Sequence, residues 1–229
     1  MNNNELTGRW DDLLRARFGV APQVGRFVEA AQAEGAEEFA RGGRVAEYNQ
    51  AKVLAAFQKH EIAARHFSGT TGYGYDDIGR DTLDRVFAST FGAEDALVRP
   101  QFASGTHALS AMLFGVLMPG DELLSATGKP YDTLEETIGI SGNAPGSLRR
   151  YGISYAQTEL REDGGIDLPG ILAKMTDHTK VVHFQRSRGY AWRRALTVAE
   201  IGSAIKAIKA ARPEVIVTVD NCYGEFTAL

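Results

Sequence analysis

After residue 80, apolar runs of strand length alternate with segments of helical period, and this alternation most constrains the fold. The runs are rich in β-branched residues, and in each following segment the apolar residues recur every three or four positions. Such βα repetition predicts an α/β fold, a three-layer αβα structure with a mostly parallel sheet between two helical layers. The predicted strands cover residues 95–101, 121–127, 152–157, 180–185 and 214–220, and the predicted helices cover 81–92, 105–118, 131–139, 168–175 and 197–211.

The residues before this alternation have a different pattern. From residue 5 to about residue 67 the apolar residues follow a helical period. The stretch FSGTTGYGYDDIGR, residues 67–80, carries no strong period and predicts an ordered loop. We therefore expect an N-terminal helical segment at 1–66 and a large domain at 67–229.

Composition narrows the range of partners. The formal charge is −4, with acidic and basic residues mixed along the chain, so the basic stripe that nucleic acids require is missing. The longest apolar stretch, ALSAMLFGVLM, is too short to cross a bilayer, and the polar start MNNNELTGRW lacks a signal-peptide core. The single cysteine, Cys222, excludes internal disulfides and cysteine-based metal clusters. We expect a cytoplasmic protein with neither nucleic-acid nor membrane partners.

One polar cluster lies where the predicted strand 95–101 gives way to an apolar helix. Ser104, Gly105 and Thr106 occupy this turn, and exposed amides at a helix start bind anions such as phosphate. The alternative is that Ser104 only caps the helix. His107 beside it is expected to be structural.

A second cluster follows the predicted strand 121–127. Tyr131 comes after a Gly-Lys-Pro loop, where its ring would be placed to stack on a flat aromatic ligand. The alternative is a packing role. Lys129 in the same loop has the amine that Schiff-base chemistry requires, but an exposed loop lysine is usually just charged and solvated.

A third cluster, QRSRGYAWRR, begins at the end of the predicted strand 180–185. An arginine fork at a strand end suits a carboxylate or a phenolate oxygen, and Arg186 and Arg188 are the first arginines of this stretch. The alternative for two or three of its four arginines is a solvated rim.

Asp220 ends the last predicted strand. Aspartate is a poor strand former, and in sheets of this kind ligand sites form beyond the carboxyl ends of the strands. A carboxylate there can hold a metal, orient a water or pair with a cationic ring nitrogen.

The sequence lacks the motifs of several common ligand sites, which excludes those classes of site. The GKP of TGKPYD does not complete a phosphate loop, GYGYDD lacks the third glycine of a dinucleotide fingerprint, and HEIAARH lacks the histidine spacing of zinc proteases. We expect no metal site. The remaining ligand has a phosphate, a flat face and a basic nitrogen, which describes pyridoxal 5′-phosphate.

Taken together, four motifs resemble a known family. The chain is similar to the aluminium resistance proteins, also described as methionine gamma-lyase-like, in the cysteine and methionine metabolism group of fold-type I pyridoxal phosphate enzymes. The resemblance runs from about His66 to Phe226. It rests on HFSGTTGYGYDDIGRDTLDRVFASTFGAEDALVRPQFASGTHAL, GKPYDTLEETIG, QRSRGYAWR and VDNCYGEF, in that order.

The resemblance implies roles for matching positions. Gly105 and Thr106 match the phosphate-binding turn, Tyr131 matches the aromatic residue that covers the cofactor ring, and Asp220 matches the partner of the pyridinium nitrogen. Arg188 falls near a residue that in related lyases faces the ring hydroxyl.

The loop before residue 81 also matches the family. Tyr75 and Arg80 sit where related enzymes lend a Tyr and an Arg to the phosphate of a neighbouring subunit. Their spacing is wider than the Tyr-x-Arg of the broader group, so Tyr73 is an alternative to Tyr75. The shared site implies a homodimer or homotetramer of the full-length protein.

The resemblance also implies a reaction. The full-length protein is expected to be a carbon–sulfur lyase acting on a small sulfur amino acid, of the methionine gamma-lyase or cystathionine beta-lyase type. In the family the Schiff-base lysine lies after this aspartate, and none of the lysines in the chain matches its position. We therefore expect an amino-terminal fragment with an incomplete large domain and no small domain, inactive by itself.

Two other functions stay open on the sequence. An aminotransferase or a β-eliminating desulfurase would share the phosphate turn and Asp220. The chain could also be a non-catalytic remnant or an interaction module, because an open, truncated sheet exposes strand edges that favour association.

Overall fold

The computed structural model describes residues 3–73, 75–142 and 144–228. The chain divides into two compact units: residues 1–62 together with 226–229, and residues 63–225. The division of domains at residue 66 that the sequence suggests stays a prediction. Among the described residues, no helix combines the length and the apolar character needed to cross a membrane.

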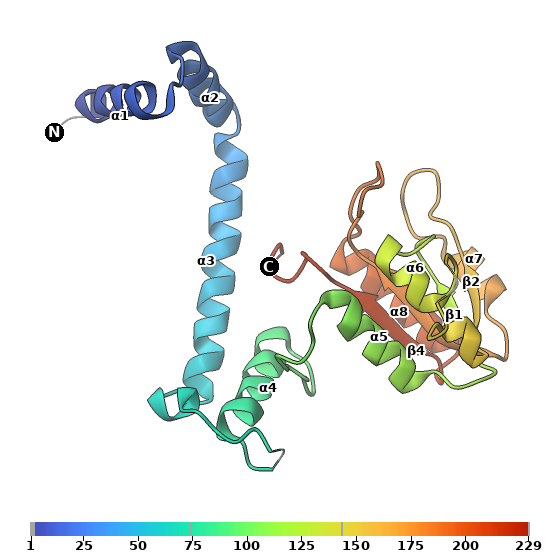
Figure 1. The fold of residues 1–229 in the computed structure, drawn as a ribbon. Coiled ribbons are helices and arrows are strands. Elements are labelled where there is room, and N and C mark those ends of the chain that lie inside the picture. Colours follow the sequence, from blue (N-terminus) through green and yellow to red (C-terminus); the bar gives the residue numbers. More distant parts are fainter. Residues whose placement is uncertain (1–2, 74, 143, 229) are drawn as a thin grey trace. The chain divides into compact units, whose positions relative to one another are not determined.

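The first unit is helical, as its periodicity predicts. Its helices are α1 (Asn3–Phe18), α2 (Pro22–Glu34) and α3 (Ala36–Lys59) (Figure 1). Pro22 starts α2 because a proline at the first helical position has the right backbone angle and needs no amide partner. Buried Asn49 donates from Nδ2 to the carbonyl oxygens of Phe226 (3.2 Å) and Ala228 (3.1 Å), which ties residues 226–228 to α3.

The second unit contains a four-stranded parallel sheet. Its strands are β1 (Glu122–Ser125), β2 (Ser154–Gln157), β3 (Thr179–Gln185) and β4 (Ile216–Asp220), in the order β2-β1-β3-β4. The connection from β1 leads to β2 on one side, and the connection from β3 leads to β4 on the other side. The direction of the connections across the sheet therefore switches between β1 and β3. Ligands bind at such a switch point, beyond the carboxyl ends of the strands.

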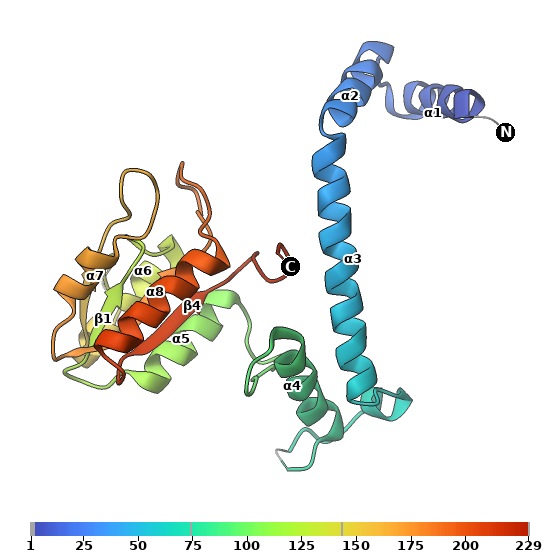
Figure 2. The same ribbon diagram turned by 180° about the vertical axis from the view of Figure 1, so that it is seen from behind.

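Helices cover both faces of this sheet (Figures 1 and 2). One face packs on α5 (Gly105–Val116) and α6 (Asp132–Ile138), and the other packs on α7 (Leu168–Lys174) and α8 (Val198–Ala211). The prediction of a three-layer αβα fold is confirmed.

Side-chain alternation along the strands sorts the core into two clusters. Leu123 and Val181 belong to the cluster with α5 and α6, whereas their neighbours Leu124 and Val182 belong to the cluster with α7 and α8. All four side chains are fully buried, which explains why the strands have continuous apolar runs in the sequence. The same alternation decides which polar side chains at the strand ends share a face.

Short elements complete the second unit. These are the 3₁₀ turns η1 (Ala64–Phe67) and η2 (Leu148–Tyr151) and the helix α4 (Ile78–Phe91). α4 starts earlier than the sequence predicts because the carboxylate of Asp77 caps it, accepting from the Arg80 amide at 3.0 Å.

The strand predicted at 95–101 is wrong. The structure has no strand over these residues. The Asp84 carboxylate accepts from the Val98 amide at 2.8 Å and from Arg99 Nη1 at 2.7 Å, so a side chain of α4 provides hydrogen bonds in place of a neighbouring strand. An extended segment without an adjacent strand cannot join a sheet, whatever its β propensity.

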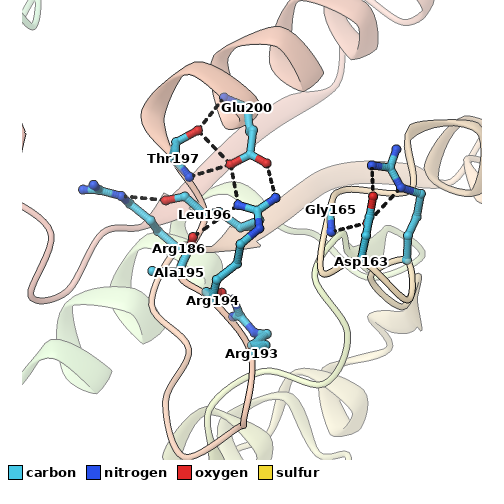
Figure 3. A network of polar contacts seen from close by, with 10 residues as sticks. Asp163, Gly165, Arg186, Arg193, Arg194, Ala195, Leu196, Thr197 and Glu200 are labelled. Atoms are coloured by element: carbon cyan, nitrogen blue, oxygen red, sulfur yellow. Dashed lines mark hydrogen bonds and ion pairs between the residues drawn. The ribbon is translucent and has the colours of Figure 1, made fainter.

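Helix α8 begins with a capping box (Figure 3). Thr197 Oγ1 accepts from the Glu200 amide at 3.2 Å, and the Glu200 carboxylate accepts from the Thr197 amide at 2.9 Å. Glu200 is also paired with Arg194, at 2.8 Å from Nη1. This network fixes the start of the helix that leads into β4.

Replacing Thr197 with Ala should lower the free energy of unfolding by about 1 kcal/mol, because the first-turn amide loses its acceptor. Urea unfolding followed by circular dichroism measures the change. Ser203→Ala is the matched control, because Ser203 is an exposed residue in the interior of α8. A Thr197→Ala protein as stable as this control would contradict the capping role.

Candidate active site

Asp220 and Gln185 lie side by side at the carboxyl edge of the sheet. They are the last residues of β4 and β3, and the strand register pairs them directly. The Arg186 amide donates to the Asp220 carbonyl oxygen at 3.0 Å, which continues the pairing one step beyond the strands. Because strand side chains alternate, both residues point to the face that carries α5 and α6.

The Asp220 carboxylate is partly exposed and is held by the turn that follows it. Its Oδ1 accepts from the Cys222 amide at 3.0 Å. Tyr223, in the same turn, has a left-handed backbone with φ of 68°. A carboxylate fixed in this way is positioned to accept a further hydrogen bond or to face a positive charge.

Arg186 fastens the same turn to the sheet. Its Nη1 donates to Asn221 Oδ1 at 2.8 Å and to the Gly224 carbonyl oxygen at 2.6 Å. Its Nε donates to the Leu196 carbonyl oxygen at 3.1 Å (Figure 3). A Cβ at Gly224 would lie 2.3 Å from Arg186 Nη1, so only glycine leaves room for this guanidinium. Arg186 is thus engaged with the protein itself, and the cofactor contact expected for Arg188 stays a prediction.

Tyr131 sits beside Gln185. Its backbone amide donates to Gln185 Oε1 at 2.7 Å. Tyr131 is also the N-cap residue of α6. The Tyr131 hydroxyl donates to the Tyr190 hydroxyl at 3.2 Å, and the two ring centroids are 5.7 Å apart. The hydrogen bond to Tyr190 raises the pKa of Tyr131 to about 12, so its hydroxyl stays protonated at neutral pH.

The turn before α5 is a helix start capped by a side chain. Ser104 is the N-cap, and its Oγ accepts from the His107 amide at 3.1 Å. The capping role considered for Ser104 is therefore confirmed, and its cofactor role stays a prediction. The first amides of a helix have no acceptor within the helix, so those of Gly105 and Thr106 point out of its end.

His107 is structural in this turn. Its Nδ1 accepts from the Ala103 amide at 3.2 Å, and its ring meets Phe102 edge to face at 5.7 Å. These contacts fix the segment that leads into α5. The sequence-based expectation for His107 is consistent with them.

Hydroxyl pairs connect α5 to α6. Thr106 Oγ1 lies 2.7 Å from Thr133 Oγ1, and Ser110 Oγ lies 3.2 Å from Thr137 Oγ1 one turn further along both helices. The helix that starts at Gly105 and the helix that Tyr131 precedes are thus joined at their N-terminal ends.

A continuous path of neighbours therefore connects the main predicted site residues. It runs from Asp220 to Gln185 by register, to Tyr131 by a hydrogen bond, and through α6 to Thr106. Asp220, Tyr131 and the 104–106 turn lie on one face at one edge of the sheet.

Arg188, Tyr75 and Arg80 are placed differently. Arg188 is exposed in the loop after β3, where its carbonyl oxygen accepts from the Ala191 amide at 3.0 Å. Tyr75 is 87% exposed, and Arg80 Nε pairs with Asp81 at 3.2 Å. Among the contacts of the described residues, none brings these three into the path above, and their roles stay predictions.

Lys129 follows β1 in the loop before Tyr131. Its Nζ pairs with Glu135 at 2.9 Å, and its side chain is 57% exposed. An ammonium in this position has the solvated, charged character expected from the sequence. It is a poor candidate for a nucleophilic amine, which must lose its proton.

A buried polar pair lies one row below Asp220 and Gln185. His183 and Thr218 are register partners, and His183 Nδ1 is 2.9 Å from Thr218 Oγ1. Burial lowers the pKa of His183 to about 4, although the nearby charge of Asp220 acts in the opposite direction. His183 Nε2 is buried without a hydrogen-bond partner within the described residues.

Several residues of this region carried little signal in the sequence. Gln185 and Tyr190 lie inside a stretch noted for its arginines, and Thr133 is one of five polar residues in a helix of seven. His183 had the clearest signal, as an ionisable residue between the apolar residues Val182 and Phe184 of a strand. Its partner was not predictable, because Thr218 lies 35 residues away.

Known proteins resemble this chain over most of its length. The uncharacterized protein YnbB of Bacillus subtilis (strain 168) is 51% identical over 183 residues, which are 80% of this chain and 44% of that protein. A crystal structure from Listeria monocytogenes, assigned as a candidate cystathionine beta-lyase involved in aluminum resistance, is 52% identical with a TM-score of 0.83. It matches 87% of this chain and 49% of its own.

A second crystal structure gives the same result. The carbon-sulfur lyase involved in aluminum resistance from Clostridium novyi NT is 44% identical with a TM-score of 0.88, over 95% of this chain and 52% of its own. The chain thus spans about half the length of these relatives. Residues 24–229 match the family described as methionine gamma-lyase, and the chain belongs to that family.

Proposed function

We propose that the full-length protein containing these residues is a pyridoxal 5′-phosphate-dependent carbon–sulfur lyase that acts on a sulfur amino acid. The observation that carries the proposal is the path from Asp220 through Gln185 and Tyr131 to Thr106, at the switch point of the sheet. The family and the name of the Clostridium novyi relative support the same reaction class.

Pyridoxal 5′-phosphate, when bound, supplies an electron-withdrawing ring that stabilises negative charge at the α-carbon of an amino acid. The donors of this chain fit such a molecule. A Cβ built at Gly105 meets nothing within 4 Å, so the protein leaves the approach to the α5 amides open. The positive end of the α5 dipole favours a phosphate there.

Tyr131 and Asp220 would hold the ring between the phosphate turn and the end of β4. Tyr131 presents an aromatic face, for which offset stacking adds about 0.5–1.5 kcal/mol beyond burial. Asp220 presents a carboxylate that would accept a hydrogen bond from the ring nitrogen and keep that nitrogen protonated. Arg186 fixes the turn that follows Asp220.

Candidate substrates are methionine, cystathionine and cysteine. The proposed reaction is elimination from the β or the γ carbon of the substrate. We also propose a cytoplasmic homodimer or homotetramer in which Tyr75 and Arg80 reach the phosphate of the neighbouring subunit, with Tyr73 as the alternative to Tyr75.

Product analysis of the full-length protein tests the reaction class. Elimination should yield ammonia, a keto acid and a thiol from the sulfur amino acid. A transferred amino group without thiol release would instead indicate an aminotransferase, and alanine with sulfide removal would indicate a desulfurase. Absence of all these products would support a non-catalytic protein.

We propose further that residues 1–229 do not include the lysine that forms the Schiff base. The amines of Lys129, Lys174 and Lys209 are engaged with Glu135, the Gln157 carbonyl oxygen and the Val215 carbonyl oxygen. The chain should therefore be inactive by itself.

Borohydride reduction of the purified chain with pyridoxal 5′-phosphate should label no lysine stoichiometrically, because no amine is held against the ring. Peptide mapping by mass spectrometry provides the measurement, and Lys129→Arg is the matched variant. One equivalent of label on Lys129 that disappears in this variant would refute the assignment.

A further inference from the structure

The loop after β3 packs on Tyr131 in a way that the proposed roles do not use. Tyr190 is 85% exposed, yet its ring and its hydroxyl both meet Tyr131. The ring planes are inclined by 31°. The neighbouring Trp192 is 99% exposed, so aromatic residues of this loop are not generally packed.

The backbone of the loop passes close to the Tyr131 ring at Gly189. Gly189 has a φ of 56°, and a Cβ there would lie 3.4 Å from Tyr131 Cδ2 and 3.6 Å from Gln185 Nε2. A side chain at this position would therefore strain the backbone, while its Cβ would make ordinary van der Waals contact with the Tyr131 ring. The turn brings Tyr190 next to the Tyr131 hydroxyl.

The base of the loop is fixed by other hydrogen bonds. The Ser187 carbonyl oxygen accepts from Gln185 Nε2 at 3.2 Å and from Arg193 Nη2 at 2.5 Å. The Leu196 amide donates to the Arg186 carbonyl oxygen at 3.2 Å. The side-chain amide of Gln185 thus accepts from the Tyr131 backbone amide with its oxygen and donates to the loop with its nitrogen.

We infer that Tyr190 is a positioning residue, which fixes the plane of the Tyr131 ring and holds its hydroxyl so that Tyr131 can cover the ring of a phosphorylated pyridine. This inference rests on the proposed function. It assigns to Tyr190 no contact with the reacting atoms. Its effect on a ligand passes through Tyr131, and so the part that depends on the hydroxyl pair should vanish when the Tyr131 hydroxyl is absent.

The first measurement uses no ligand. Near-ultraviolet circular dichroism of the 229-residue chain reports tyrosines in fixed, asymmetric surroundings. Tyr190→Phe and Tyr131→Phe should each reduce the tyrosine signal, and the double variant should lose less than the sum. Trp192→Phe is the matched control for the loop and should leave the tyrosine signal unchanged.

The second measurement uses pyridoxine 5′-phosphate, which has the ring and the phosphate but no aldehyde to condense with lysines. Calorimetric titration should show about fivefold weaker binding for Tyr190→Phe, the loss expected from one hydrogen bond. In a Tyr131→Phe background, Tyr190→Phe should have no further effect. Tyr190→Ala should weaken binding more than Tyr190→Phe, since the ring is lost as well.

The outcomes separate this inference from the proposed function. An unchanged tyrosine signal in Tyr190→Phe would show that the Tyr131–Tyr190 contact does not fix the Tyr131 ring, and would overturn the inference. A lost signal with unchanged affinity, or an equal effect in both Tyr131 backgrounds, would overturn the positioning role. A wild-type chain that shows the tyrosine coupling but binds no pyridoxine 5′-phosphate would refute the proposed cofactor site and leave Tyr190 a purely structural neighbour of Tyr131, which also overturns its role in positioning.

Discussion

Replacing Asp220 with Asn in the full-length protein should lower kcat for carbon–sulfur bond cleavage by about 10²- to 10³-fold, the range typical for removing a charge-stabilising group from an active site. A neutral amide cannot keep the ring nitrogen protonated, so the ring withdraws electrons less strongly. The amide oxygen still accepts from the Cys222 amide, so the turn after β4 should be kept. Steady-state release of thiol measures the effect.

The control for this substitution is Asp163→Asn. Asp163 is an exposed partner of Arg161 in the loop before α7, on the opposite side of the sheet from α5 and α6. This variant should retain full activity. If Asp220→Asn also stays within threefold of the wild type, the carboxylate is not the partner of the ring nitrogen.

Lowering the pH from 6.5 to 4.5 should reduce the free energy of unfolding by about 2–3 kcal/mol through His183 alone. Burial lowers the pKa of His183 from 6.5 to about 4, so in the folded protein it is mostly neutral over this range. The unfolded chain takes up the proton, which favours unfolding. Stability is therefore full above pH 6.5 and is lost as the pH falls toward 4.

Urea unfolding at pH 7, 5.5 and 4.5 tests this dependence in His183→Gln, whose side chain does not titrate. The variant should be less stable at pH 7 but should lose much less stability on acidification. His178→Gln serves as the control, because His178 is exposed just before β3. An equal pH dependence in the wild type and in His183→Gln would show that other groups dominate.

Carboxylates act in a lower pH range. Hydrogen bonds from Arg194 and Thr197 lower the pKa of Glu200 from 4.5 to about 2. The stability that such a depressed pKa provides is present above about pH 4.5 and is lost only below that value. The interval between 6.5 and 4.5 therefore reports mainly on His183.

The layers of the fold were predictable because both faces of the sheet are buried. Leu123 and Leu124, or Val181 and Val182, point to opposite clusters, so adjacent apolar residues of a strand are both buried and the strand pattern differs from the helical one. The segment 95–101 has a short apolar run as well, residues 96–98, flanked by Asp95 and Arg99. Its failure to form a strand depends on Asp84, whose carboxylate accepts from the Val98 amide, and a local pattern contains no information about such a partner.

The site was predictable only in part, for the same reason. The shared position of Asp220 and Tyr131 at one edge of the sheet was predictable, because Asp220 ends a strand, Tyr131 follows one, and the edge of a parallel sheet brings such residues together. The different behaviour of Arg186 and Arg188 was not predictable. Arg186 is drawn to Asn221, 35 residues away, and local sequence does not show which of two nearby arginines will find such a partner.

The two hydroxyl pairs between α5 and α6 have a further consequence. They connect the helix that begins at Gly105 with the helix that Tyr131 precedes, through Thr106 with Thr133 and Ser110 with Thr137. An anion that immobilises the N-terminal end of α5 would also restrict the N-terminal end of α6. The conformational entropy of Tyr131 would then be lost before a ring binds, so binding of the ring would cost less. The phosphate and the pyridine ring are two parts of one ligand. They would then bind with positive cooperativity, because each orders the site for the other.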